Sequence, residues 1–503
     1  MSLDVALSNA RSGLLLAQRQ LAQSADNVAN AGTAGHTRKT VEGRAVGVRD
    51  LGMGARAEVA TRDVDAAVAA RLDAARGERA GAEAREAILS GVERAHGDPE
   101  SGGSVGDLLA ALRTAFSGLR ESPAEGPRQR AAVDAAASLA TRFNETADAV
   151  GRARQEAQEG LEADVRALNA ALREVAGLNR EARLLKAEGR STAAVEDRRD
   201  AAVARVAEVI GVRAVAGADG GVSLFARGGH VLPLDERGPD AFSVAPATLG
   251  PSAIGPAVLM GGTLDVTRAL PGGRLAEHAR LRDETLPRMG AELDVLAAAT
   301  ARRLEGQGLR LFDAPPSGAV PDPADPYSVP ASGLMGFAGV VRVNPAVAAD
   351  PALARDGTHA VPGFVPNPPG GPSAFAALID RVTERALGTA SAPGVPQPAL
   401  PNAGLGPDGT LGSSLGGVAG RSVADQAARL VAAHTGERAA ATSAREAASD
   451  TLGALEARSH DRSGVDTDAE MAAMVALQNA YAANARVLSA VQGMYDALLS
   501  AVR

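Results

Sequence analysis

The sequence predicts a mainly α-helical, elongated bundle with coiled-coil helices at both ends and an inserted β-containing domain, a multidomain α+β protein. Apolar residues make up 45% of the chain, but much of that share is alanine, and aromatic residues make up only 2%. Alanine favours helices and buries little area, so these stretches suit long, closely packed helices. Both ends also carry heptad repeats. We expect the 57 glycines and 28 prolines to lie mainly outside the helices.

The N-terminal helix is predicted over residues 2–29. Leucine and smaller residues recur there at alternating steps of four and three, which is the spacing of a coiled-coil seam. The smaller members would let a partner helix approach closely. The predicted seam consists of Leu3, Leu7, Ala10, Leu14, Ala17, Leu21, Ser24 and Val28.

The C-terminal helix is predicted from Ser463-Gly464 to Arg503, again with a heptad seam. One strongly polar member, Asn484, is of the kind that fixes the register of a coiled coil at some cost in stability. Helices so far apart in the chain can pair only if the chain doubles back, which predicts a rod with both termini at one end. The predicted seam consists of Met474, Leu477, Tyr481, Asn484, Leu488, Val491, Tyr495, Leu498 and Val502.

Between these ends the pattern changes several times. Two alternating apolar runs around Ala218-Asp219-Gly220-Gly221 predict a β-hairpin. One helix is expected near 373–387, with Ser373 as its N-cap. The predicted segments are an N-terminal coiled-coil helix and extended loop (1–60), a long-helix bundle (61–210), a β-rich insertion (211–274), a return helix (275–305), a Pro/Gly-rich irregular inserted domain (306–420), a bundle helix (421–462) and the C-terminal coiled-coil helix (463–503).

Charge and composition exclude several function classes. The net charge is −8 and no basic stripe is present, so we expect no nucleic-acid binding. The first residues lack the pattern of a cleaved secretory signal, and no apolar run is long enough to span a bilayer. We therefore expect a soluble protein without membrane contact that leaves the cell, if it does, by another route. The absence of cysteine excludes disulfides and thiolate metal sites.

We find no catalytic, cofactor or metal site and predict that the protein is not an enzyme. The seven histidines are scattered through the sequence. The spacing of Asp466, Asp468 and Glu470 faintly resembles a calcium loop, but an acidic first turn that stabilises the last helix explains it better. Asn27 and Asn30 share a helix face near a helix C-cap, where their amides could bind a neighbouring backbone.

The ends resemble a known family, the flagellar rod, hook and hook-associated proteins. The stretch Ser24–Arg38 is similar to that family's Asn-x-x-Asn signature and turn, although Ala34 and His36 replace its usual Pro and Tyr. The C-terminal matches are Ser463-Gly464-Val465-Asp466, the stretch Leu477–Leu488 and Met494-Tyr495-Asp496-Ala497-Leu498-Leu499. Together with the long helices between them, these motifs identify the chain as a member of that family.

Within the family the chain is most similar to the FlgK type of hook-associated protein 1. Asp107–Asn144 resembles its helical pair, Glu196-Asp197-Arg198-Arg199-Asp200 stands where its Leu-Asp-Gln-Arg-Asp motif is expected, and Gly272-Gly273-Arg274-Leu275 is similar to its helix start. The resemblance implies a structural adaptor of the hook–filament junction, exported unfolded by the flagellar secretion apparatus without a cleaved signal and located outside the cell.

The partners implied by this resemblance are a ring of like subunits, the hook protein, the second junction protein and an export chaperone. A hook or distal-rod subunit and a cytoplasmic coiled-coil scaffold are the alternatives. The first is expected to carry strands after the N-terminal motif, and the second would stay in the cell. The residues expected at the assembly interface are Leu3, Leu7, Leu14, Leu21, Asn27, Asn30, Met474, Leu477, Tyr481, Asn484, Leu488, Val491, Tyr495 and Leu498.

Overall fold

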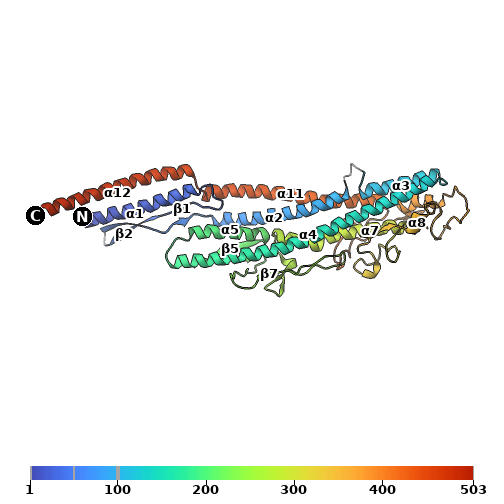
Figure 1. The fold of residues 1–503 in the computed structure, drawn as a ribbon, viewed down its shortest axis with the longest axis horizontal. Coiled ribbons are helices and arrows are strands. Elements are labelled where there is room, and N and C mark those ends of the chain that lie inside the picture. Colours follow the sequence, from blue (N-terminus) through green and yellow to red (C-terminus); the bar gives the residue numbers. More distant parts are fainter. Residues whose placement is uncertain (1–2, 49–50, 98–101, 502–503) are drawn as a thin grey trace.

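The computed structural model describes residues 3–48, 51–97 and 102–501 of the chain, and Val502 of the predicted seam lies outside them. The molecule is a long rod with both ends of the chain at the same end (Figure 1). The prediction of a mainly helical, elongated protein with long terminal helices is confirmed. The helices are α1 (Leu3–Ala29), α2 (Ala66–His96), α3 (Val105–Glu121), α4 (Gly126–Ala187), α5 (Ala193–Val209), α6 (Gly273–Arg280), α7 (Leu286–Glu305), α8 (Pro345–Ala349), α9 (Leu353–Asp356), α10 (Ala377–Arg381), α11 (Val423–Ser463) and α12 (Thr467–Ala501).

Helices α2, α3 and α11 begin at residues whose side chains bind free backbone amides. Ser104 and Asp107 form a capping box at the start of α3, and Ser422 and Asp425 form another at the start of α11. The carboxylate of Asp65 accepts bonds from two amides at the start of α2. Each cap satisfies donors that the helix itself leaves unpaired.

The strands are short and pair in an antiparallel manner. The predicted hairpin is present as β5 and β6, which pair from Val212↔Ala226 to Ala216↔Val222, and Gly220 in its turn has φ 93°. Such a positive φ favours glycine. The strands are β1 (Lys39–Thr40), β2 (Gly43–Val48), β3 (Leu51–Ala57), β4 (Thr61–Arg62), β5 (Val212–Ala216), β6 (Val222–Ala226), β7 (Phe242–Ser243), β8 (Leu259–Met260), β9 (Leu264–Asp265), β10 (Phe312–Asp313), β11 (Arg342–Val343), β12 (Ala390–Ala392) and β13 (Val395–Pro396).

Two buried asparagines of α4 hold the β-rich segment against that helix. The Asn179 amide donates to the carbonyl of Val222 at 2.8 Å, and the Val222 amide donates back to Asn179 Oδ1 at 2.9 Å. Asn169 makes the same two bonds to Phe242, at 2.8 and 3.0 Å. Each asparagine therefore acts like a strand partner and satisfies backbone groups that would otherwise be buried without bonds.

A thick apolar core lies at the end of the rod that is remote from the termini. There α3, the first half of α4 and α7 pack with the segment 306–415, and Phe116 and Phe337 are almost fully buried. A second core joins the other half of α4 to α5, α6 and the β-rich segment, with Leu168 and Leu224 in its centre. Among the described residues, neither core contains a residue of α1 or α12, so the apolar area buried in these two cores belongs to the body of the rod.

A chain of buried polar side chains crosses the first core. His96 Nε2 of α2 lies 2.8 Å from His434 Nδ1 of α11, and His434 Nε2 lies 2.9 Å from Glu292 Oε2 of α7. Burial, followed by the charges of His434 and Arg142, lowers the pKa of His96 to about 3, so its ring is neutral. This chain ties α2, α7 and α11 together deep inside the bundle.

Asp294 of α7 holds the inserted segment 306–415 in place. Its carboxyl is buried and receives bonds from the Tyr327 hydroxyl at 2.7 Å and from the amides of Gly336 and Ala338 at 2.8 Å. Burial raises the pKa of Asp294 to about 6, although these three bonds oppose the rise. The inserted segment is therefore attached through a buried carboxyl that accepts three hydrogen bonds and, within the described ranges, is not paired with a cation in the core.

Stability should fall as the pH rises through the range in which Asp294 ionises. In the unfolded chain its pKa is 3.8, so the buried acid favours the folded state at low pH, and this contribution is lost between about pH 4 and 6. The difference corresponds to about 3 kcal/mol. Urea unfolding of the wild type and of Asp294→Asn at several pH values checks this, because the variant should lose that decrease. A decrease of equal size in both proteins would contradict it.

One local prediction is wrong. Ser373 does not cap a helix, because α10 begins after Ala376, which makes no side-chain cap. Instead the Phe375 amide bonds to the carbonyl of Pro372, and Arg355 donates to the carbonyl of Ser373 at 3.2 Å. A tertiary contact therefore holds this stretch as a turn.

Across the described ranges, no helix combines the length and apolar character that crossing a membrane requires.

Candidate functional site

The two terminal helices pair with each other and project from the body of the rod (Figure 1). They run antiparallel: Ser24 contacts Glu470 near the body, and Asp4 accepts a bond from the Tyr495 hydroxyl near the free end. The predicted seams face each other along this length. Ala10 and Ala17 are the most deeply buried alanines of α1, as expected where small residues let the helices approach closely.

The polar seam residue Asn484 lies against a glycine. A Cβ atom on Gly13 would lie 2.7 Å from the Asn484 side-chain oxygen, so the two helices approach closely at this point. The Asn484 amide also donates to the carbonyl of Ala480 in its own helix at 3.0 Å. A glycine opposite an asparagine matches only one alignment of the helices, which agrees with the role in register expected for Asn484.

The predicted interface residues differ in how far the single chain covers them. Val491 and Asn27 are buried, whereas Tyr481 and Leu498 remain 47% and 54% exposed. The half-buried ones are Leu3, Leu7, Leu14, Leu21, Asn30, Met474, Leu477, Asn484, Leu488 and Tyr495. The helix pair therefore covers its seam only in part, and the role of these residues between subunits stays a prediction.

Asn27 closes the turn that follows α1. Its amide donates to the carbonyl of Lys39 at 2.9 Å, and the Lys39 amide donates to Asn27 Oδ1 at 3.1 Å. Asn30, just beyond the end of α1, donates to the backbone carbonyl and to the carboxylate of Asp26 in that helix. Asn27 therefore binds backbone as expected, but the backbone belongs to its own chain. These two bonds hold strand β1 against the end of α1.

Glu470 connects this turn to the start of α12. It is almost fully buried and accepts bonds from the Ser24 hydroxyl at 2.5 Å and from Arg38 Nε at 2.6 Å. Burial raises the pKa of Glu470, but the bonds from Ser24 and Arg38 outweigh it and leave that pKa below its usual value. The carboxylate is therefore ionised at neutral pH and holds both terminal helices to the turn.

The turn is joined to the body of the rod through Asp197 of α5. This carboxylate accepts bonds from Lys39 Nζ at 2.7 Å, from the Thr37 hydroxyl at 2.6 Å and from Arg62 Nη1 at 3.1 Å. The side chains of Lys39 and Asp197 are 6% and 10% exposed, so their ion pair is largely withdrawn from water. Together with the residues that hold the turn to α1 and α12, this cluster forms what we call the joint. It consists of Ser24, Asn27, Thr37, Arg38, Lys39, Arg62, Asp197 and Glu470.

Neighbouring carboxylates strengthen the joint around Arg62. Its guanidinium also pairs with Glu196 at 2.8 Å and with Asp200 at 2.7 Å. Burial alone would lower the pKa of Arg62, but Asp200 and Glu196 raise it above its usual value. His36, beside Lys39, has a lowered pKa because of burial and of the lysine charge. The joint is therefore a network of ion pairs held in place by their partners, and it is suited to connect the turn firmly to the body of the rod.

The acidic motif at the start of α12 acts as a helix cap. Asp466 Oδ1 accepts bonds from the amides of Asp468 and Ala469, at 3.0 and 3.1 Å. Glu470 points the other way, into the joint. Among the residues that the structure describes, no group of three or more histidine, aspartate or glutamate side chains is arranged to hold a metal ion.

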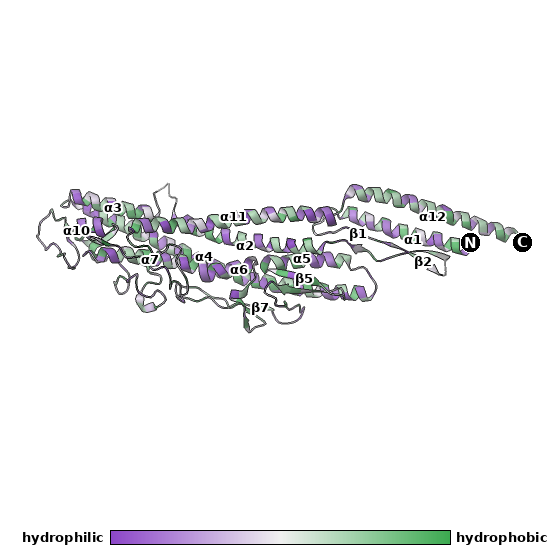
Figure 2. Cartoon of the chain, turned by 180° about the vertical axis from the view of Figure 1, so that it is seen from behind, coloured by the Kyte–Doolittle hydropathy of each residue, from purple (hydrophilic) through white to green (hydrophobic). Residues whose placement is uncertain are grey.

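The surface of α12 that faces away from α1 is unusually apolar. Arg486 and Asp496 are the charged residues between Met471 and Ala501. Hydrophobic residues lie on several sides of this helix (Figure 2). The large apolar side chains of α12 that are about half exposed or more and do not belong to the predicted seam, which we call the outer residues, are Met471, Val475, Val487, Met494 and Leu499.

Comparison with known families decides the identity of the chain. Residues 89–311 match the family model described as the flagellar hook-associated protein FlgK helical domain. Residues 461–501 match the C-terminal model of the flagellar basal body rod FlgEFG proteins. These two matches support a FlgK-type flagellar hook-associated protein. This confirms the family resemblance found in the sequence, and the family is one of structural flagellar proteins.

One similar solved structure is the flagellar hook junction protein FlgK from Burkholderia pseudomallei. It is 21% identical, has a TM-score of 0.40, and the match covers 49% of this chain and 44% of that chain. The match therefore spans less than half of that FlgK. A comparison with curated proteins found no match.

Sequence reasoning singled out part of the joint without its connections. Asp197 lies in the motif that resembles the FlgK type, and Glu470 was assigned only to the first turn of α12. Lys39 and Arg62, which lie in strands β1 and β4, were missed because their partners Asp197 and Asp200 lie far away in the sequence, in helix α5. The sequence signal that could have pointed to Lys39 and Arg62 is the cluster of charged residues that closely follows the predicted turn.

Proposed function

We propose that this FlgK-type protein is a structural adaptor at the junction of the flagellar hook and filament. The observation that carries this proposal is the surface of α12, which is apolar on several sides although α1 covers only one of them. A helix that is apolar all round is normally buried on all sides. Neighbouring copies of the chain in a tube wall would provide that cover, so the terminal pair forms the inner part of the tube.

The remaining parts of the chain fit this proposal. The joint connects the helix pair to a rigid body through buried ion pairs, so that the body can project outward at a fixed angle. The partners are a ring of like subunits, the hook protein, the second junction protein and, before export, a chaperone. The protein acts outside the cell after export without cleavage of a signal, contributes to flagellum assembly and motility, and has no catalytic role.

The alternative within the family is a hook or distal-rod subunit. The C-terminal match alone would suit such a subunit equally well, because its model is that of basal body rod proteins. The match of residues 89–311 to the FlgK helical domain favours the junction. The long helices α2, α3 and α4 that follow the N-terminal motif also favour it, because a hook or rod subunit is expected to carry strands there.

The proposal predicts a single location and a specific defect. Immunogold labelling of the tagged protein on isolated hook–basal bodies should mark the distal end of the hook. Cells without the gene should complete their hooks and release unassembled filament subunits into the medium. Label along the whole hook or rod would instead indicate a hook or rod subunit, and retention in the cytosol would indicate a coiled-coil scaffold. Restoring the gene controls for effects on its neighbours.

A further inference from the structure

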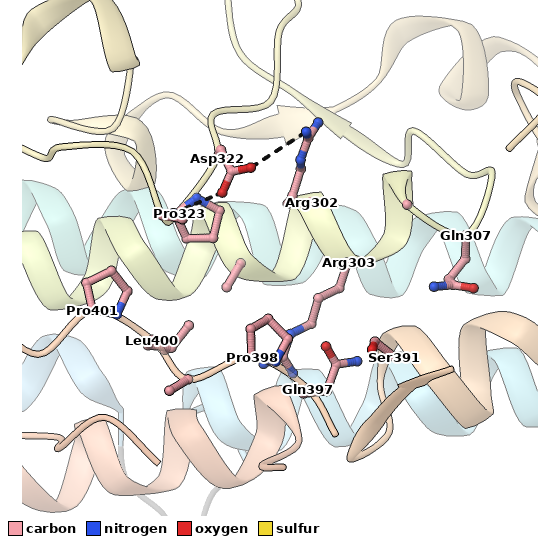
Figure 3. Close-up of a pocket in the computed structure, with 14 residues that line it drawn as sticks. Arg302, Arg303, Gln307, Asp322, Pro323, Ser391, Gln397, Pro398, Leu400 and Pro401 are labelled. Atoms are coloured by element: carbon pink, nitrogen blue, oxygen red, sulfur yellow. Dashed lines mark hydrogen bonds and ion pairs between the residues drawn. The ribbon is translucent and has the colours of Figure 1, made fainter. Parts of the chain in front are cut away.

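A cavity of about 550 Å³ lies where the end of α7 meets two loops of the inserted segment. Its walls come from α7 around residues 299–307, from the loop at 322–324 and from the loop at 391–401. Its size is in the range of cavities that bind small molecules. Figure 3 shows the Arg303 side chain extending from α7 across this cavity toward Gln397 and Pro398.

In the part of the chain that the structure describes, Arg303 is not paired with a carboxylate, although Asp322 also lines the cavity. Its neighbour Arg302 pairs with Glu305 at 2.9 Å and approaches Asp322 at 3.7 Å. Glu305 is also occupied by Arg310, at 2.6 Å. Within the described ranges the Arg303 side chain makes one hydrogen bond, from Nη1 to the carbonyl of Arg421 at 3.1 Å, and joins no ion pair. Burial lowers the pKa of Arg303 to about 10, so it is still a cation at neutral pH.

The surroundings of Arg303 are prepared for a ligand. Gln307 lines the same cavity, and its buried Oε1 atom has no hydrogen-bond partner in the structure; this acceptor can take an N–H or O–H of a bound ligand but no bond from an ionised carboxylate. Pro323, Pro398 and Pro401 form parts of the wall, together with the aliphatic side chain of Leu400. Proline restricts its own backbone, so this wall loses little conformational entropy when something binds. A half-buried guanidinium with free donors, next to an apolar wall, matches a carboxylate that carries a short aliphatic group.

We propose that this cavity binds a carboxylate on a short aliphatic chain through Arg303. The guanidinium donates two parallel bonds to the two oxygens, and the aliphatic part lies against the proline and leucine wall. A free small carboxylate and the side chain of a glutamate in a partner peptide share this chemistry. Residues far from the terminal helices form the site, so it is independent of the proposed role in the junction.

Nuclear magnetic resonance of the full chain tests the proposal through the arginine Nε–Hε signals. Titration with sodium propionate should shift the Arg303 signal in a saturable manner at millimolar concentration, whereas sodium chloride of equal ionic strength should not. Propionate should also raise the melting temperature. The same titration with acetylated, amidated Ala-Glu-Ala and Ala-Gln-Ala distinguishes the sources: tighter binding of the glutamate peptide than of propionate indicates a peptide partner, and the reverse indicates a free carboxylate.

Two variants provide the control. Arg303→Gln should abolish the rise in melting temperature with propionate, and Arg302→Gln should keep it, because the Arg302 charge is already paired. The wild-type signal of Arg303 decides the question even if Arg303→Gln folds poorly. An Arg303 signal that does not move with propionate or the glutamate peptide, or a rise of equal size in Arg303→Gln, overturns the proposal.

Discussion

Replacement of Asp197 by alanine should release the terminal helices from the body of the rod. The substitution leaves the ammonium group of Lys39 buried without its partner, and it also removes bonds from Thr37 and Arg62. Breaking a buried pair by removing one partner costs about 3–5 kcal/mol. The loss falls on the joint and not on the apolar cores, so the body should stay folded while the turn and the helix pair open.

Limited proteolysis and differential scanning fluorimetry measure this effect. The Asp197→Ala protein should be cut rapidly between about residues 30 and 62, while its main melting transition moves little. Asp200→Ala is the matched control, because Asp200 is 45% exposed and contacts only Arg62 of the joint. The double variant Lys39→Met/Asp197→Leu should recover much of the resistance, since no buried charge is left alone. Equal cleavage of the Asp197→Ala and Asp200→Ala proteins would contradict the role of the joint.

The terminal helices could be predicted well because their information is local. The heptad spacing of leucines in 3–28 and of apolar residues in 474–498 depends only on neighbours within a few turns. Even the place of Asn484 was visible as a polar interruption of the seam. Its opposite neighbour, Gly13, was not, because the alignment of two helices more than four hundred residues apart depends on how the whole chain folds back.

The joint and the buried histidines could not be predicted for the same physical reason. Lys39 and Asp197 are separated by 158 residues, and His96 and His434 by 338. In the sequence each is one charged or polar residue among many. Only folding decides that these four lie in buried positions where a partner is needed. Ser373 shows the opposite failure, because its local cap signal is not used: the chain turns at residues 372–375 and the helix begins only after Ala376.

The separation of seam and outer surface has a direct consequence for assembly. Val487 is 48% exposed and, by its position around the helix, lies away from the seam that contains Leu488. Replacing Val487 by aspartate should therefore leave the single chain folded, since exposed substitutions usually change stability by less than about 0.5 kcal/mol. In the assembled tube the same carboxylate would be buried without a partner. We expect loss of filament attachment and of swimming, with normal export.

Leu488→Asp should block filament attachment for a different reason. Its charge lies in the half-buried seam, so it weakens the pairing of α1 and α12 already in the isolated protein, which hydrogen exchange of α1 would detect. Ala454→Asp, at an exposed site on α11 of the body, adds the same charge and should leave swimming intact. Swimming assays and counts of attached filaments compare the three. Cells that swim normally with Val487→Asp would show that the outer residues of α12 stay in contact with water after assembly, and the proposed packing of this helix in a tube wall would then be wrong.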